Sequence, residues 1–350
     1  MIMRFIFATL LIALSGSALA NTEVDHPRTP WDTPDFTGTY DTATLTPVQR
    51  PNFYGNELYV TKEQAEERAR QTAAALAANN AQKDPNREAP PEGGDGSPGA
   101  AGNVGGYNTF WIDNGETLNS VDGKFRTSII TYPENGRRPE MTPEGIARIR
   151  ALFRSFARND GTANWISREG PGPYDNPEGL TLADRCLQGF SSTGGPPMMP
   201  ALYNNHKKIV QGPDKIVILV EMVHDARTIR LNSEHPSEDV RYWMGDSIGW
   251  WEDDTLVVET TNFNDTPAQG GASRHLKVLE RFERIDDRNL HYSFEVEDPT
   301  TWKDKWAGDY VWPQSDERIF EYACHEGNYA MGNILRGARR LEREALAASN

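Results

Sequence analysis

The chain has 350 residues and a formal net charge of −15 at pH 7. An electrostatic field of this sign repels nucleic-acid phosphates and anionic lipids, so we expect neither as a partner. Beyond residue 20 no apolar run is long enough to cross a bilayer, so we expect no membrane insertion.

Residues 1–20 have the organisation of a secretory signal peptide. Arg4 provides a positive charge, Phe5–Leu14 is an apolar core, and Ala18–Ala20 is a small-residue cleavage site. No cysteine follows that site, so we expect no lipid anchor. We therefore expect a periplasmic or secreted protein, in a compartment that permits disulfides.

Residues 21–185 are expected to form a region that covers the rest of the protein. The segment 21–60 is rich in Pro, Thr and Asp and predicts an extended chain laid on a core. Thr61 and Gln64 form a capping box, which predicts a helix over about residues 61–78.

The rest of the covering region alternates irregular and regular segments. Residues 79–106 are rich in Asn, Pro, Gly and Ala, which predicts a flexible loop. Strands are predicted at Phe110–Ile112 and Lys124–Tyr132. Thr142 is an N-cap followed by proline, and the apolar period after it predicts a helix over about residues 142–157.

Residues 186–350 follow a repeated β pattern. Lys215–Val223 is nearly all apolar, as in a strand covered on both faces. His275–Arg284 and Leu290–Val296 alternate and predict a β-hairpin. Further strands are predicted at Thr255–Thr260, Trp302–Trp312 and Arg318–Ala323, and a last amphipathic helix at about Asn333–Ala348. Consecutive hairpins predict a mainly β (α+β) fold, a lipocalin-like antiparallel meander barrel or a sandwich, with two or three peripheral helices.

The chain has two cysteines, Cys186 at the start of a Gly/Pro-rich loop and Cys324 near the end of the β pattern. In an exported protein we expect a disulfide between them, closing a loop of roughly 140 residues. Buried free thiols and a metal-binding or catalytic thiol are the alternatives.

Glu280 is a charged residue on an apolar face of the predicted hairpin. It shares that face with Leu276, Val278 and Phe282. A carboxylate that points inward must be paired, be protonated, or line a wet cavity. Three interpretations follow: a buried ion pair with an arginine, a functional acid in a cavity, or a local bulge that turns the side chain outward.

A second candidate lies at the end of the most apolar strand, in Glu221–Arg227. Polar groups at the mouth of a barrel are a common place for a site. His224 has the chemistry of a general base near neutral pH, Glu221 can orient it, and Arg227 can hold a carboxylate or an oxyanion. The alternative is a capped strand end with surface ion pairs.

A third candidate is the motif that contains His325, directly after Cys324. A disulfide there would hold the imidazole close to the loop 186–200 as a fixed acid or base. The alternative is a histidine that hydrogen-bonds a loop carbonyl. The candidate ligand-binding residues in this neighbourhood are Tyr203, Asn205 and Asn328.

Trp250 is a fourth ligand-binding candidate. It adjoins Trp251, so in a strand the two rings point to opposite faces and one of them lies outside or in a pocket. An aromatic wall suits sugars, terpenoids or phenolics. Ordinary packing is the alternative.

Two familiar kinds of site are disfavoured by context. Gly245–Gly249 matches G-x-S-x-G, but a hairpin rather than a helix follows it, so we interpret it as a turn and not as the nucleophile of a serine hydrolase. The histidines lack metal-ligand spacing and no phosphate-binding glycine loop follows a strand. We therefore expect no metal, nucleotide or other cofactor.

Several segments of the chain resemble a widespread group of uncharacterised exported bacterial proteins. These segments are Glu221–Arg227, Gly245–Glu252, Asp254–Phe263, Tyr322–Tyr329 and Arg126–Ile130. The resemblance covers most of the mature chain and implies export, but it brings no activity with it. The likeness of the meander to lipocalins is an analogy of fold only.

Two functions fit these patterns. In the first, which we favour at this point, the protein is an acid/base enzyme of the isomerase, lyase or hydratase type. It acts on a small, partly apolar or aromatic molecule in a barrel cavity. In the second, it is a non-catalytic periplasmic binding or carrier protein for such a molecule. Catalysis requires two titratable groups from the set Glu280, His224 and His325 within hydrogen-bond reach, whereas a carrier needs only the cavity.

Overall fold

The computed structural model describes residues 26–80, 86, 88, 112–152, 162–189, 194–265, 267 and 269–348. Four sequence predictions fall wholly or partly outside these ranges. They are the signal peptide, nearly all of the loop 79–106, the first two residues of the strand Phe110–Ile112, and the end of the helix 142–157.

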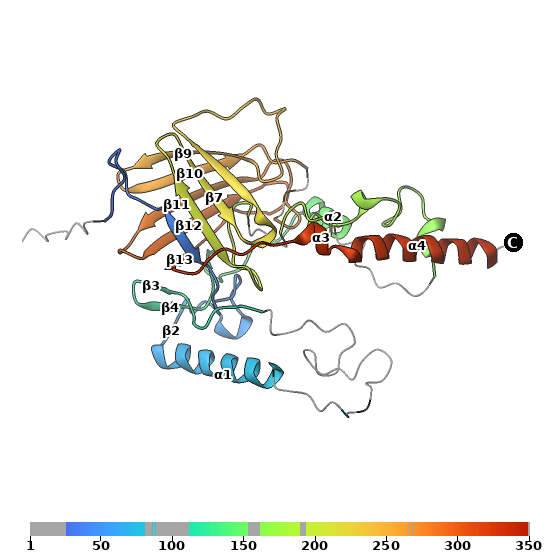
Figure 1. The fold of residues 1–350 in the computed structure, drawn as a ribbon, viewed down its shortest axis with the longest axis horizontal. Coiled ribbons are helices and arrows are strands. Elements are labelled where there is room, and N and C mark those ends of the chain that lie inside the picture. The colour runs from blue at the N-terminus through green and yellow to red at the C-terminus, as the bar shows by residue number, and fades with distance from the viewer. Residues whose placement is uncertain are drawn as a thin grey trace, which may run out of the picture.

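Nine strands form a closed β-barrel (Figure 1). Their order is β1-β6-β7-β8-β9-β10-β11-β12-β13, and β13 pairs with β1 to close the sheet. The predicted mainly β barrel is thereby confirmed. The barrel strands are β1 (Gly38–Asp41), β6 (His206–Gln211), β7 (Lys215–Val220), β8 (Ala226–Leu231), β9 (Asp246–Glu252), β10 (Thr255–Thr261), β11 (Lys277–Arg284), β12 (Asn289–Glu297) and β13 (Trp306–Ser315).

One neighbouring pair departs from the predicted antiparallel meander. Strands β8 and β9 run parallel, with Ile229 opposite Ser247. Parallel neighbours need a long connection, because the chain must return to the starting end of the first strand. Residues 232–245 supply that connection here.

The covering region contributes to the barrel itself. Strand β1 lies between β6 and β13, and the hydroxyl of its buried Tyr40 donates to the carbonyl of Phe36 at 3.0 Å. Strand β5 (Ile130–Tyr132) pairs with β13 at the point where β13 shifts register. The strands β2 (Tyr59–Val60), β4 (Lys124–Arg126) and β3 (Ser120–Val121) form a separate small sheet.

The predicted helices are present and are capped as their sequences suggest. Helix α1 (Lys62–Asn80) starts at the capping box, where Thr61 N–H donates to Gln64 Oε1 at 2.9 Å and Gln64 N–H donates to Thr61 Oγ1 at 3.3 Å. Helix α2 (Pro143–Leu152) is capped by the Thr142 hydroxyl.

Helix α4 (Tyr329–Ala348) projects away from the barrel and follows the short helix α3 (Cys324–Gly327) (Figure 1). One face of α4, including the buried Ala338, packs on a small separate core with Trp165, Tyr174 and Leu180. Shorter 3₁₀-helical turns lie at Asn52–Tyr54, Asn164–Ser167, Pro177–Gly179 and Met222–His224.

Two strand-level predictions are wrong. Residues 318–323 form no strand; they belong to an extended segment without ladder pairing that leads from β13 to α3. Residues 245–249, interpreted as a turn, lie almost wholly in β9. Glycine at 245 and 249 suggested a turn, but Gly249 lies inside the strand, where the close approach of Ile229 of β8 leaves no room for a side chain.

The predicted apolar face of the hairpin, with Glu280 on it, is confirmed. Val278 lies opposite Val296, Glu280 opposite Phe294, and Phe282 opposite Tyr292. All six side chains are buried. The alternation therefore placed the Glu280 carboxylate inside the barrel.

Candidate functional site

The inward carboxylate of Glu280 is held by Arg227. Glu280 is 0 % exposed and Arg227 is 2 % exposed. Both terminal nitrogens of Arg227 donate to the carboxylate, and the Tyr292 hydroxyl donates to Oε1 of Glu280 at 2.8 Å. Arg227 also donates to Ser247 Oγ at 3.0 Å and to Thr260 Oγ1 at 2.9 Å. Of the three interpretations of Glu280, the structure therefore shows the buried ion pair with an arginine.

Aromatic side chains pack the barrel around this pair. Tyr292, Tyr310 and Trp312 are fully buried, with the ring centroids of Tyr292 and Trp312 4.7 Å apart. Met198, from the loop that precedes β6, donates its N–H to Tyr292 Oη and accepts from the Tyr310 hydroxyl, each at 2.8 Å. Burial raises the pKa of both tyrosines, so both keep their hydroxyl protons near neutral pH. The interior beside Glu280 is thus a packed and hydrogen-bonded core.

Lys207 is a second charge-bearing group inside the barrel. It is 1 % exposed, its Nζ donates to Thr42 Oγ1 at 2.6 Å, and it lies 5.5 Å from the centre of the Trp312 ring. Burial lowers the pKa of Lys207 to about 7, because the charged ammonium loses its hydration. Strand β6 alternates, so Lys207 and Ile209 point inward while Lys208 is exposed.

Glu221 and His206 attach the segment 316–323, which we call the terminal segment, to the barrel. Glu221 Oε1 accepts from the N–H of Phe320 at 2.8 Å, and its Oε2 lies 3.6 Å from His206 Nδ1. The other ring nitrogen of His206 lies 3.7 Å from Glu317. Burial tends to raise the pKa of Glu221, but the hydrogen bonds from His206 and Phe320 outweigh it and hold the pKa below its ordinary value. The hydrogen bond with Glu221 raises the pKa of His206.

A strained turn at the barrel mouth positions Asp225. Val223 and His224 both have left-handed backbone conformations, with φ of 58° and 47°. A β-branched residue in this region is an outlier, and such strain clusters at functional sites. The carboxylate of Asp225 accepts from the N–H of Gly189 at 3.4 Å and packs directly against Gly194. Burial raises the pKa of Asp225 to about 6.

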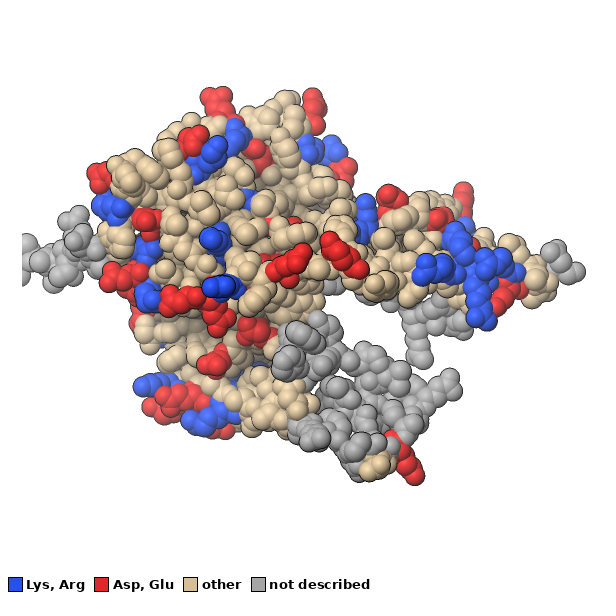
Figure 2. Space-filling model, viewed as in Figure 1, with Lys and Arg blue, Asp and Glu red and all other residues tan. Residues whose placement is uncertain are grey.

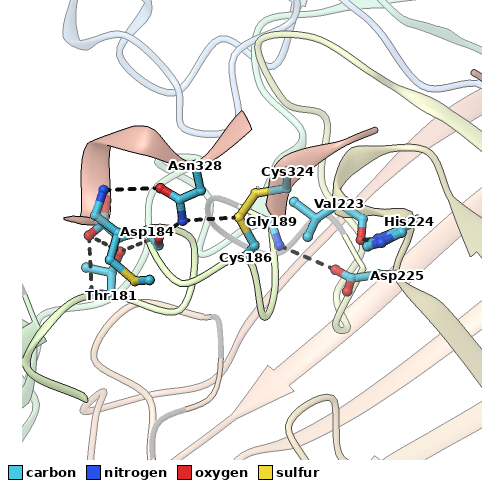
Figure 3. The surroundings of a disulfide bond; sticks show 10 residues. Thr181, Asp184, Cys186, Gly189, Val223, His224, Asp225, Cys324 and Asn328 are labelled. Atoms are coloured by element: carbon cyan, nitrogen blue, oxygen red, sulfur yellow. Dashed lines mark hydrogen bonds between the residues drawn. A yellow bond between two sulfur atoms is a disulfide. The ribbon is translucent and has the colours of Figure 1, made fainter. Parts of the chain in front are cut away.

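The predicted disulfide between Cys186 and Cys324 is confirmed, with Cα atoms 5.7 Å apart (Figure 3). Asn328 lies beside it and donates to the carbonyl of Asp184 at 2.7 Å and to Cys186 Sγ at 3.5 Å. The same side chain accepts from the N–H of Met331 at 3.2 Å, so it also caps the start of α4. Figure 3 shows the turn with Val223, His224 and Asp225 on the opposite side of the disulfide from Asn328. The disulfide therefore joins the loop after residue 180 to helix α3, and the hydrogen bond from Gly189 to Asp225 connects the same loop to the barrel mouth.

A groove of about 660 Å³ runs along the disulfide. Tyr322 forms part of its wall and stacks on Tyr203, with ring planes 5° apart and centroids 6.5 Å apart. Phe320 in the same wall is 70 % exposed. The groove is lined by Ala183, Asp184, Cys186, Asn204, Phe320, Glu321, Tyr322, Ala323, Cys324, Gly327, Asn328, Ala330, Met331 and Ile334.

The structure brings some of the predicted site residues together and separates others. Arg227 and Glu280 are paired inside the barrel, whereas His224 and His325 are exposed on its outside. The Nδ1 atom of His224 contacts the carbonyl of Val223. Thus the two imidazoles do not join the buried carboxylate in one hydrogen-bonded cluster.

Only two of the four predicted ligand-binding residues lie near the groove. Tyr203 and Asn328 lie at or beside the groove. Asn205 is 1 % exposed and is used internally, because its amide donates to the carbonyls of Asp113 and Ala201. Trp250 is half-buried on β9, and its indole N–H donates to Glu252 at 3.0 Å.

Sequence reasoning missed Asp225, Lys207 and Phe320. Asp225 directly follows the candidate His224, so its place at the strand end was a usable signal. Lys207 and Lys208 are adjacent, and the sequence did not say which of them points inward. Phe320 was assigned to a strand that does not exist, which hid its exposure.

No protein-family model matches the chain, and no curated protein matches it. Among the described residues, no group of three or more His, Cys, Asp or Glu side chains is placed to hold a metal ion. None of the helices in the described part of the chain is long and apolar enough to span a membrane.

Proposed function

We propose that this is an exported binding protein for a small, partly apolar or aromatic molecule, and that the ligand occupies the groove beside the disulfide. The observation that carries the proposal is the groove itself. Its volume of about 660 Å³ lies in the usual range for small-molecule sites. Such sites combine a mainly apolar lining with a few polar groups, as the aromatic, aliphatic, amide and carboxylate side chains do here.

Exposed apolar side chains around the groove support the same proposal. Phe320 and Ile334 line it and are 70 % and 39 % exposed. Scattered exposed apolar residues are ordinary, but their concentration at one hollow indicates a surface that a ligand can cover.

The arrangement of titratable groups favours binding over acid/base catalysis. Glu280 accepts three hydrogen bonds from Arg227 and Tyr292 and is 0 % exposed, so its carboxylate is engaged inside the core. His224 and His325 are exposed and separate from it. A catalytic pair needs both members within hydrogen-bond reach of one reacting molecule.

Export is part of the proposal. The signal-like residues 1–20 support it, and the disulfide is of the kind that persists in an oxidising compartment. N-terminal sequencing of protein recovered from the periplasm or the medium tests it. Cleavage after Ala20 is the expected result, and an intact N-terminus inside the cell would contradict it.

The binding site is tested by closing the groove from an exposed helix position. Ala330 lines the groove and is itself exposed, so Ala330→Trp fills the hollow without disturbing the core. Ala347→Trp, at an exposed position of α4 that is outside the groove, is the matched control. We expect small aromatic compounds that bind the wild type in calorimetry to bind the control equally and to lose affinity for Ala330→Trp. Equal binding to all three proteins would place the ligand elsewhere.

A further inference from the structure

The ionisable side chains of the groove carry one sign of charge. Asp184 and Glu321 line it, and no Lys, Arg or His is among its described lining residues. Figure 2 shows acidic side chains where the terminal segment meets α3, and basic side chains gathered over the far part of α4. A ligand in the groove therefore meets carboxylates and no fixed cation.

Several basic residues lie close in sequence to the lining, and none of them is among the lining residues; Arg318, two residues before Phe320, is exposed. Arg185 lines a different hollow, together with the acidic residues Glu178 and Asp265. Arg336 on α4 donates to Asn333 at 2.6 Å. His325 is exposed and does not line the groove.

The aromatic side chains of the groove also favour a positively charged ligand. Phe320 and Tyr322 line it, and Tyr322 is held in place by its stack on Tyr203. The face of an aromatic ring attracts cations through its quadrupole, by about 0.5–1 kcal/mol at exposed sites. Carboxylates and aromatic faces together are the usual surroundings of an organic ammonium group.

We propose that the ligand of this groove is a small organic cation, an amine or quaternary ammonium with an apolar or aromatic body. The ammonium group lies beside Glu321, because Asp184 Oδ2 already accepts from the N–H and the hydroxyl of Thr181. The apolar body covers Phe320, Met331 and Ile334. This assignment rests on the proposed function, because it names the ligand class of the same groove. The net charge of −15 raises the local concentration of such a cation and lowers that of an anion.

The test compares three probes of similar size and different charge by calorimetry: 2-phenylethylamine, 2-phenylethanol and phenylacetate. We expect the amine to bind the wild type about tenfold more tightly than the alcohol, and phenylacetate to bind most weakly, because exposed carboxylates and rings each contribute modestly. The advantage of the amine should shrink as salt is added.

Two charge-neutralising variants separate the groove from the rest of the surface. Glu321→Gln should weaken the amine about three- to fivefold and leave the alcohol unchanged. Glu326→Gln removes an exposed carboxylate of α3 outside the groove lining and should leave both unchanged.

The outcomes distinguish the two proposals. If the three probes bind equally to the wild type and all are lost in Ala330→Trp, the groove binds ligands but the cationic class is wrong. An amine preference that survives both Glu321→Gln and Ala330→Trp would place the cation elsewhere and overturn this inference. If none of the probes binds the wild type, both the ligand class and the binding function are overturned.

Discussion

Replacing Glu280 with glutamine tests whether the barrel core depends on its buried ion pair. Glutamine keeps the size of the side chain and an oxygen that accepts from Tyr292, but it removes the charge that compensates Arg227. Arg227 is 2 % exposed, so its guanidinium would be left in the core without a counter-charge. Breaking a buried pair in this way costs about 3–5 kcal/mol. That is a large part of the 5–15 kcal/mol typical of a folded domain.

Urea unfolding followed by tryptophan fluorescence measures the effect, since the chain has nine tryptophans and Trp312 lies beside the pair. Glu283→Gln, an exposed position on the same strand, is the matched control and should stay within about 0.5 kcal/mol of the wild type. The double variant Arg227→Met with Glu280→Leu should regain much of the loss, because Ser247 and Thr260 already hydrogen-bond each other at 2.9 Å. A free energy of unfolding for Glu280→Gln within 1 kcal/mol of the wild type would refute this reasoning.

Three further outcomes follow from the groups around the mouth. Replacing Cys186 and Cys324 with serine should lower the free energy of unfolding by about 5 kcal/mol in the chain-entropy model, measured in urea and compared with the wild type in reductant. The pKa of Asp225 is raised to about 6, because the folded protein favours the protonated carboxyl. The stability that this preference gives the folded state is fully present below about pH 4 and is lost as pH rises through about 6. The free energy of unfolding should fall by about 2–3 kcal/mol across that range, and Asp225→Asn should abolish this slope. The pKa of His206 is also raised, so the protonated imidazole stabilises the terminal segment below the ordinary pKa of histidine, and this stabilisation is lost above the raised pKa. In the wild type, hydrogen exchange of residues 316–323 should therefore accelerate with pH by more than the intrinsic rate does. A pH profile of exchange that is the same in His206→Gln would contradict this prediction.

Sequence patterns anticipated much of the barrel because strand alternation is a local property. The buried face of β11 followed from which side chains are apolar, and it correctly placed Glu280 inward. N-cap residues did the same for α1 and α2, since a cap involves residues only three apart. The failures came where local signals conflict with pairing: Gly245–Gly249 looks like a turn, and residues 318–323 look like a strand.

The candidate site was predictable in its neighbourhood but not in its composition. The two cysteines indicated that the loop after residue 186 and the motif at 322–329 lie together, and they do. The sequence placed the ligand inside the barrel, where Tyr292 and Trp312 now form packed core. It gave no sign that the exposed wall beside Cys324 is the more open surface.

By itself the sequence determined several of the barrel strands, which face of the hairpin is buried, where the helices begin and which cysteines can pair. Each of these depends on periodicity, on capping over a few residues, or on the count of thiols. Only the tertiary structure decided that Arg227, 53 residues away, neutralises Glu280, that β1 closes the barrel, and that a groove opens along the disulfide. These depend on how distant segments meet in space, which the packing of the whole chain fixes and no local pattern encodes.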